Sequence, residues 1–243
     1  MKQEFKKICA AADIKNAKPM IFVEGNVGVG KSSFLHVLNE KLGSHVFYEP
    51  NELWQDVDGH NLLEAFFIDQ KRWAYALQSY IVMTRVDQMI TADTTLCDKV
   101  CFVERSVYSG RYIFAEVAKD IGTMNSLEWC LYKKVWDRDI AQIQRPAAGF
   151  IYLRTPAEIC YNRIIKRGRQ EENPITMDYL NRLEQKHENW FIKKIGVPEN
   201  LAYVPVLVLD FSDNFETSEV MQEQYFDLIV DFINKIDSSD VKK

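Results

Sequence analysis

The stretch IFVEGNVGVGKSSFLHVL, residues 21–38, decides the fold of this chain. An apolar, β-rich run leads into GNVGVGKS, which matches the pattern GxxxxGK[ST], and an amphipathic helical pattern follows. Glycines in such a turn let consecutive backbone N–H groups surround phosphate oxygens, and the start of the following helix adds partial positive charge. The alternative is a glycine-rich turn with an incidental lysine, which the match in both sequence and context disfavours. The stretch therefore predicts a nucleoside-triphosphate site.

Two side chains of this phosphate loop have expected chemical tasks. Lys31 is expected to reach the β- and γ-phosphates, and the hydroxyl of Ser32 to coordinate Mg²⁺. The loop does not identify the phosphate acceptor, because GTPases, motor ATPases and small-molecule kinases share it. The residues expected around the donor are Gly25, Asn26, Val27, Gly28, Val29, Gly30, Lys31, Ser32 and Ser33.

Length and composition predict one large domain. The chain has 243 residues, of which 47% are hydrophobic, and no repeat or linker divides it. We expect a flexible N-terminal leader over residues 1–18 and a single domain over residues 19–243. A net charge of −5 argues against nucleic acid as a partner, and no apolar run is long enough to span a membrane. Five cysteines without metal-ligand spacing, together with a leader that has no signal-type apolar core, predict a cytoplasmic location.

Short β-rich runs alternate with long helical patterns along the chain. This alternation predicts an α/β fold in which helices flank a five-stranded parallel sheet. Ligands of such sheets bind at the carboxyl ends of the strands. Pro156 suits the first turn of a helix. The predicted strands are residues 20–23, 45–48, 100–103, 149–153 and 204–209, and the predicted helices are residues 32–42, 72–91, 126–144, 156–166, 177–194 and 220–236.

Two predicted strands end in acidic residues. Glu49 follows the second run, and Glu104-Arg105 follows the third. A carboxylate at such a position can bind Mg²⁺ or accept a proton from a hydroxyl group, and an adjacent arginine can hold it or a phosphate oxygen. The alternative is a pair of surface charges. Their joint presence beside a phosphate loop favours a catalytic role.

A third cluster is basic. Arg163, Lys166 and Arg167 share one helix face, Gly168 ends the helix, and Arg169 follows. A solvated basic face is the usual explanation of such a run. Next to a phosphate loop, we interpret it as an arginine-rich lid that closes over the transferred phosphate.

These motifs together resemble one family. The phosphate loop, EP at residues 49–50, ERSVYSGRYIF, and RIIKRGRQEE followed by YL and KHENW are similar to the deoxyribonucleoside kinases. That family includes deoxycytidine, deoxyguanosine and mitochondrial thymidine kinases and the insect multisubstrate enzyme. The likeness extends from about residue 19 to residue 215, and residues 61–80 are especially similar to the insect and mitochondrial thymidine branch.

The resemblance implies a P-loop kinase of nucleotide salvage. It implies transfer of the γ-phosphate of ATP, with UTP as an alternative donor, to the 5′-hydroxyl of a deoxynucleoside in the presence of Mg²⁺. It also implies a homodimer formed through long helices, for which residues 72–91 and 126–136 are candidates, although core packing explains their apolar side chains equally well.

The resemblance assigns roles at the phosphate end of the site. Glu49 matches the family's general base, whose main contribution in a loose transition state is orientation. Glu104 matches the Mg²⁺-side carboxylate, and Arg105 matches a cation near the 5′-oxygen. Arg163, Arg167 and Arg169 match lid arginines.

It also assigns roles at the nucleoside end. Glu172 matches a ligand of the ribose 3′-hydroxyl, and Gln78 matches the amide that pairs with the base edge. Trp54 and Phe114 match aromatics of the base pocket, Phe114 by stacking. From the residues alone both could equally be core aromatics, which is the commoner role.

Two positions depart from the family pattern. Phe67 stands where the family usually has a tyrosine that binds the 3′-hydroxyl, so we expect weaker discrimination against 3′-deoxy analogues. Arg85 stands where the thymidine branch has methionine, and Gly110 replaces the aspartate that normally accompanies this arginine. The guanidinium of Arg85 then needs water or another acid as its partner, or the side chain points elsewhere. Because arginine only donates hydrogen bonds, we expect purine or cytosine deoxynucleosides to be favoured over thymidine, and methionine at position 85 to raise thymidine activity.

Two rival functions were weighed. A nucleoside monophosphate kinase shares the phosphate loop and the lid, but Trp54, Gln78 and Phe114 suit an uncharged nucleoside better. A non-catalytic relative, such as an accessory subunit of respiratory complex I, resembles these kinases and serves a structural role. The intact phosphate loop, acids and arginines count against it.

Overall fold

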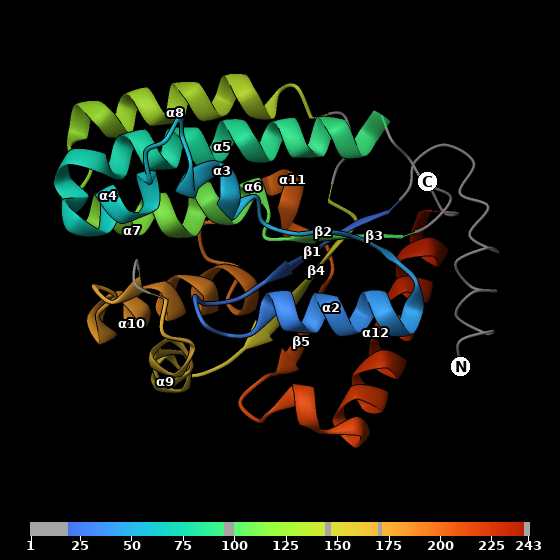
Figure 1. The fold of residues 1–243 in the computed structure, drawn as a ribbon. Coiled ribbons are helices and arrows are strands. Elements are labelled where there is room, and N and C mark those ends of the chain that lie inside the picture. Colours follow the sequence, from blue (N-terminus) through green and yellow to red (C-terminus); the bar gives the residue numbers. More distant parts are fainter. Residues whose placement is uncertain (1–18, 95–99, 144–146, 170–171, 241–243) are drawn as a thin grey trace.

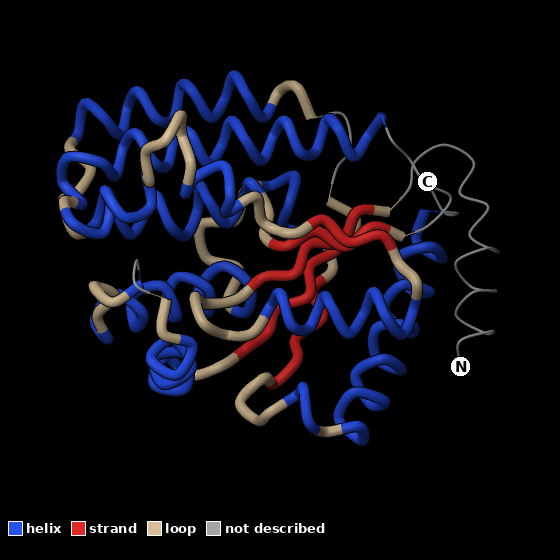
Figure 2. Tube along the Cα trace, in the orientation of Figure 1, coloured by secondary structure: helices blue, strands red, loops and turns tan. Residues whose placement is uncertain are grey.

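The β-rich runs form one parallel sheet at the centre of the molecule (Figures 1 and 2). In this computed structural model, residues 19–94, 100–143, 147–169 and 172–240 are described. The strands lie in the order β2-β3-β1-β4-β5, so that β1 is central and β2 neighbours β3. They are β1 (Met20–Glu24), β2 (His45–Phe47), β3 (Cys101–Glu104), β4 (Gly149–Arg154) and β5 (Val206–Asp210). The predicted five-stranded parallel sheet is confirmed.

Helices cover both faces of the sheet. Met20 and Phe22 of β1 pack on the face covered by α5 (Gln70–Thr94), α7 (Ala115–Asp120) and α8 (Ser126–Ile140). Ile21 and Val23 of the same strand pack on the opposite face, under α2 (Lys31–Leu42) and α12 (Glu219–Asp240). Because parallel strands are buried on both faces, they are apolar throughout, and this is why the sequence showed continuous apolar runs.

The six predicted helices are present, with two corrections. Pro156 lies at the N-cap of α9 (Ala157–Arg167) in an extended conformation with ψ 142°, so the helix begins one residue later than predicted. The pattern over residues 177–194 is α10 (Met177–His187), which continues into a π-helical turn, η3 (Glu188–Ile192).

Several short helical segments were not predicted. Each has at most seven residues, which is about two helical turns or fewer, so periodicity alone does not reveal them. They are α3 (Asn51–Gln55), α4 (Leu62–Ile68), α6 (Val107–Ser109), the π-helical η1 (Gly110–Phe114), α7, α11 (Glu199–Ala202) and η4 (Phe215–Thr217). Along the chain α3 follows β2 and α6 follows β3, so both helices begin near the carboxyl ends of these strands.

Two further expectations concern the chain outside the core. The predicted leader over residues 1–18 lies outside the described residues. In the part of the chain that the structure describes, no helix has the length and the apolar character needed to cross a membrane.

Candidate active site

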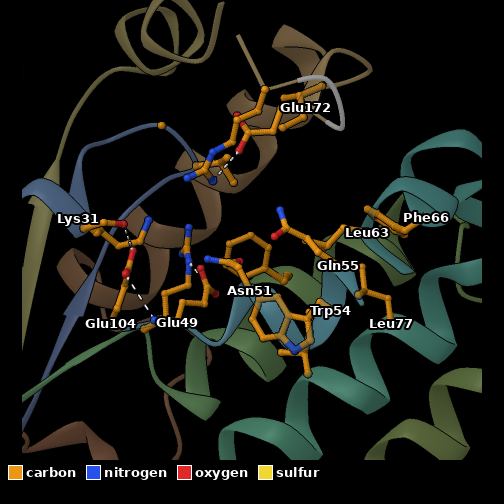
Figure 3. A pocket seen from close by; sticks show the side chains of 18 of the residues that line it. Lys31, Glu49, Asn51, Trp54, Gln55, Leu63, Phe66, Leu77, Glu104 and Glu172 are labelled. Carbon is orange, nitrogen blue, oxygen red and sulfur yellow. Dashed lines mark hydrogen bonds and ion pairs between the residues drawn. The ribbon is translucent and has the colours of Figure 1, made fainter. Parts of the chain in front are cut away.

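A cavity of about 290 Å³ opens at the carboxyl ends of the strands (Figure 3). Lys31 and Glu104 lie at one end, Trp54, Phe66 and Leu77 lie at the other, and Glu49 lies between them. Glu172 faces the cavity from the opposite side. The cavity therefore has a charged end at the phosphate loop and an aromatic, largely uncharged end between α3, α4 and α5.

Most of the predicted site residues line this cavity. Those that do are Val27, Gly28, Gly30, Lys31, Ser32, Ser33, Glu49, Trp54, Phe67, Gln78, Arg85, Glu104, Arg105, Gly110, Phe114, Arg167, Arg169 and Glu172. Four predicted residues are not among the lining side chains: Gly25, Asn26, Val29 and Arg163.

The backbone of the phosphate loop is compatible only with glycine at its tightest point. Gly28 has φ 80°, and a Cβ built there would lie 2.6 Å from the carbonyl oxygen of Cys160. The next helix, α2, begins after Gly30 without a side-chain cap, which leaves its first N–H groups available to an anion. The Asn26 side chain donates a hydrogen bond of 3.0 Å to the Leu180 carbonyl oxygen and so ties the loop to α10.

Lys31 is buried at the charged end of the cavity. Its Nζ donates to the Asn26 carbonyl oxygen at 3.0 Å. Burial, followed by the charge of Arg105, lowers the pKa of the Lys31 ammonium to about 8, against the opposing influence of Glu104 and Glu49. An arriving phosphate would supply the negative charge that this group lacks.

Ser32 and Glu104 bring two oxygens together in a way that fits Mg²⁺. The Ser32 Oγ donates to Glu104 Oε1 at 2.9 Å, so a hydroxyl and a carboxylate oxygen adjoin beside the phosphate loop. Among the described residues, no group of three or more histidine, cysteine, aspartate or glutamate side chains could hold a metal ion. This sparse donor set suits Mg²⁺, which usually keeps several waters and binds through one or two protein oxygens plus substrate phosphates.

Glu49 lies between two arginines. Its Oε1 pairs with Arg85 Nη2 and lies 3.5 Å from Arg105 Nε. Burial alone would raise the pKa of the Glu49 carboxyl, but Arg85, Arg105 and Lys31 together lower it below its ordinary value. The carboxylate is therefore ionised, as a group that accepts a hydroxyl proton or orients a hydroxyl must be.

Arg105 has a backbone conformation that is rare outside glycine, with φ 60°. Such strain costs about 1–3 kcal/mol and persists only where the surroundings enforce it. Its Nη1 donates to the Gly25 carbonyl oxygen at 2.8 Å, and its guanidinium lies 4.6 Å from the ring centre of Phe114. Arg105 thus connects the phosphate loop, Glu49 and an aromatic residue of the cavity.

Glu24 holds the residue that follows this strained turn. It is fully buried at the end of β1 and accepts hydrogen bonds from Ser106 N at 2.8 Å and Ser106 Oγ at 2.5 Å. Burial raises the pKa of the Glu24 carboxyl, although Arg105 and Ser106 oppose this. Sequence reasoning missed Glu24 because its neighbours in the chain are those of an ordinary buried strand.

At the other end of the cavity, aromatic rings surround one amide. The Trp54 Nε1 donates to Thr84 Oγ1 at 2.9 Å, which fixes the indole. The buried Gln78 Oε1 has no hydrogen-bond partner among the described residues, and Gln78 lines the cavity. Phe67 packs against Phe66 with ring centres 5.1 Å apart, and both line the cavity. This end can accept a flat, uncharged ring that offers a polar edge to Gln78.

The structure separates the three predicted lid arginines. Arg163 donates to the carbonyl oxygens of Val29 at 2.9 Å, Ser212 at 3.1 Å and Asp213 at 2.9 Å, and so binds the outer side of the phosphate loop instead of the cavity. Arg163 lies next to Ile164, and both Cys160 and Ile164 of α9 lie against Gly28 of the phosphate loop.

The other two arginines line the cavity together with Glu172. Arg167 Nη2 lies 2.7 Å from Glu172 Oε1, and Arg169 Nη1 lies 3.6 Å from the same oxygen. Glu172, the acid that the resemblance assigned to the ribose, therefore pairs with both arginines and offsets one of their two charges. Residues 170–171 of this segment lie outside the described part of the chain.

Sequence reasoning also missed several lining residues. Asn51 and Gln55 come from the short helix α3, and Tyr179 comes from α10, where burial raises the pKa of its hydroxyl to about 12. The spacing of Leu77, Ile81 and Arg85 on one face of α5 was a usable signal, since residues four apart on a helix share a face. The remaining missed residues are Leu63, Phe66 and Ile175.

Comparisons with known proteins show the family of this chain. A family model described as deoxynucleoside kinase matches residues 21–234. The chain is 37% identical to a probable deoxycytidine kinase of fowlpox virus over 218 residues, which are 89% of this chain and 88% of that protein. It is 33% identical to a mitochondrial deoxyguanosine kinase of Xenopus laevis, with 87% and 88% covered. It is also 33% identical to human mitochondrial thymidine kinase 2, with 89% and 79% covered.

Proposed function

Since the chain belongs to the deoxynucleoside kinase family, we propose that it transfers the γ-phosphate of ATP to the 5′-hydroxyl of a deoxyribonucleoside, as a phosphotransferase of nucleotide salvage. One observation carries the proposal. The Glu49 carboxylate lies between a phosphate-binding end and an aromatic end of a single cavity. A nucleoside with its base among Trp54 and Phe114 would present its 5′-hydroxyl to Glu49 and to a phosphate held by Lys31.

Residues of this chain perform each part of the reaction in this proposal. The Gly25–Ser33 loop and Lys31 bind the donor phosphates, and Ser32 with Glu104 holds Mg²⁺, which supplies charge neutralisation when bound. Glu49 orients the 5′-hydroxyl and accepts its proton, and Arg105 lies beside the same carboxylate. ATP is the proposed donor, with UTP as an alternative.

Binding of the nucleoside itself involves a second set of side chains. Gln78 pairs with the base edge, Trp54 and Phe114 enclose the base, and Glu172 binds the ribose 3′-hydroxyl after parting from Arg167. Arg167 and Arg169 then have free donors for the transferred phosphate. Arg163 supports the phosphate loop from outside the cavity.

The base preference proposed is purine or cytosine over thymine. Arg85 presents only donors, and its Nε has no hydrogen-bond partner among the described residues. It suits N3 of cytosine or N7 and O6 of a purine, and it opposes the N3–H of thymine. Gly110 adds room, since a Cβ at this position would lie 3.2 Å from Arg85 Nη1. The deoxycytidine and deoxyguanosine kinases named above agree with this preference, whereas the thymidine kinase relative does not.

A nucleoside monophosphate kinase remains the second candidate within enzymes. It needs free cations at the acceptor end, yet every lysine or arginine among the described lining residues has an internal partner. The test is initial-rate ATP consumption with each of four deoxynucleosides and each of their monophosphates, with Glu49→Gln as the inactive control. Turnover with nucleosides supports the proposal. Turnover with monophosphates alone supports the rival, and turnover with neither supports a non-catalytic relative.

We also propose a homodimer formed through α5 and α8. Met83 of α5 is 42% exposed, and Leu127 and Leu131 of α8 are 69% and 43% exposed, on two helices that lie side by side (Figure 1). Light scattering of the wild type and of Leu127→Glu tests this. A cytoplasmic location is proposed from the cysteines, since Cys130 and Cys160 are free thiols in the described part of the chain. Fractionation of expressing cells tests it.

A further inference from the structure

Arg85 occupies an unexpected position between the nucleoside end of the cavity and the catalytic carboxylate. It is 5% exposed, its guanidinium lies 5.5 Å from the ring centre of Trp54, and it lines the cavity. Its Nη1 donates to the Ser106 carbonyl oxygen at 3.1 Å, and its Nη2 pairs with Glu49 Oε1. The acid that this arginine needed is therefore Glu49.

Both arginines beside Glu49 approach the same oxygen. Arg85 and Arg105 each face Oε1, and no hydrogen bond to Oε2 is found among the described residues. A carboxylate has two oxygens with about four lone-pair sites, so one oxygen can be held while the other accepts a hydroxyl. The geometry leaves Oε2 for the acceptor 5′-hydroxyl.

Gly110 explains why Arg85 makes this contact. A glycine offers no side chain to Arg85, and its backbone lies close enough that an added Cβ would be 3.2 Å from Nη1. A buried guanidinium without an acidic partner is strongly unfavourable, so the nearest carboxylate within reach takes that place.

We propose that Arg85 is a positioning residue for the catalytic carboxylate: it holds Glu49 Oε1 beside Arg105 so that Oε2 faces the acceptor hydroxyl. This inference rests on the proposed kinase function and deepens it. Arg85 uses two of its five N–H donors in these contacts, so the others remain available to a base acceptor. The same side chain then links base recognition to the chemical step, and base identity affects kcat as well as KM.

The test separates two effects of Arg85, the positioning of Glu49 and the recognition of the base. Arg85→Met removes the partner of Glu49 and also the group that opposes thymine N3–H. We expect the single-turnover rate at saturating ATP to fall about tenfold for all four deoxynucleosides, because general-base catalysis contributes ~10²–10⁴-fold and Arg105 retains part of the alignment. At the same time, kcat/KM for thymidine should rise as a fraction of the sum of kcat/KM over the four deoxynucleosides. Arg85→Lys, which keeps the charge, should recover most of the rate.

The controls make each result decisive. Arg182→Met removes an exposed arginine that pairs with Asp178 at 2.7 Å on α10, and it should leave rates unchanged. Thermal unfolding and binding of a fluorescent ATP analogue verify that each variant is folded. If Arg85→Met does not fold, the comparison is made between Arg85→Gln and Arg85→Lys, with the lysine variant expected to be faster.

A single-turnover rate within twofold of wild type in Arg85→Met or Arg85→Gln, with changes confined to KM or to the ratio of bases, would overturn the inference. Failure of the proposed function has a different signature, since the wild-type protein would then turn over no deoxynucleoside at all.

Discussion

Protonation of His187 should destabilise this protein below pH 6.5. The ring is 0% exposed and packs against both Tyr152 and Phe191, with ring centres 5.9 Å and 6.1 Å away. Its Nδ1 donates to the Leu183 carbonyl oxygen at 2.6 Å, and its Nε2 has no hydrogen-bond partner among the described residues. A proton on Nε2 would therefore be a buried charge without an acidic partner. Burial, with a contribution from Arg105, lowers the pKa of His187 to about 3, although the backbone of Leu183 and Gly25 opposes this.

The sign and size of the effect follow from linkage. The unfolded chain, with an ordinary histidine pKa of about 6.5, binds the proton first, so stability is complete above this pH and declines as the pH falls toward 3. Each pH unit within that window costs about 1.4 kcal/mol. At pH 5 the loss from this one group is therefore about 2 kcal/mol, a large part of the margin of a typical domain.

The assay is urea unfolding at a series of pH values from 8 to 4.5, in the wild type and in His187→Phe. The phenylalanine keeps an aromatic ring in the cluster, so the wild type should lose about 2 kcal/mol more than the variant between pH 8 and pH 5. His36→Gln is the control for removal of a histidine, because the His36 side chain is 65% exposed. Equal pH dependence in wild type and His187→Phe would falsify the reasoning.

Three further predictions concern the cavity. Gly28→Ala should abolish ATP binding, because the added Cβ would lie 2.6 Å from the Cys160 carbonyl oxygen. In the control Gly43→Ala the added Cβ has no neighbouring atom within 4 Å, so ATP should bind normally. Calorimetry measures ATP binding by both variants. ATP affinity should fall about tenfold from pH 7 to pH 9, because Lys31 loses its charge around pH 8. Arginine stays charged over this range, so the same decline in a Lys31→Arg variant would contradict the prediction. Phe67→Tyr should raise the kcat/KM preference for 2′-deoxy over 2′,3′-dideoxy substrates roughly threefold to tenfold, through one regained hydrogen bond; an unchanged ratio would exclude that role.

The parts of the site that the sequence predicted are those that local structure determines. A phosphate loop is a continuous turn between a strand and a helix, so its glycines, Lys31 and Ser32 can be recognised together. Glu49 and Glu104 could be placed near each other because the carboxyl ends of neighbouring parallel strands meet, and β2 does pair with β3. Both inferences need only the order of elements along the chain.

The parts that were missed depend on contacts between elements. Helical spacing correctly puts Arg163 and Arg167 on one face of α9, but only the packing of α9 against the phosphate loop decides that Arg163 meets the loop and Arg167 the cavity. The short helix α3 supplies Asn51 and Gln55 to the cavity, and five residues are too few for a periodic pattern. Glu24 acts across the sheet on Ser106, 82 residues away in the chain.

The pairing of Arg85 with Glu49 is consistent with the charge balance of the whole cluster at the strand ends. Three acids and three cations, all buried or nearly so, meet at the carboxyl ends of β1, β2 and β3: Glu24, Glu49, Glu104, Lys31, Arg85 and Arg105. Buried charges are tolerated only when they are paired, and Gly110 offers Arg85 no acidic side chain. Glu49 can take the role because it already lies between two strand ends and has a second oxygen to spare. Gly110, which offers no side chain, therefore leaves Glu49 as the carboxylate that pairs with Arg85.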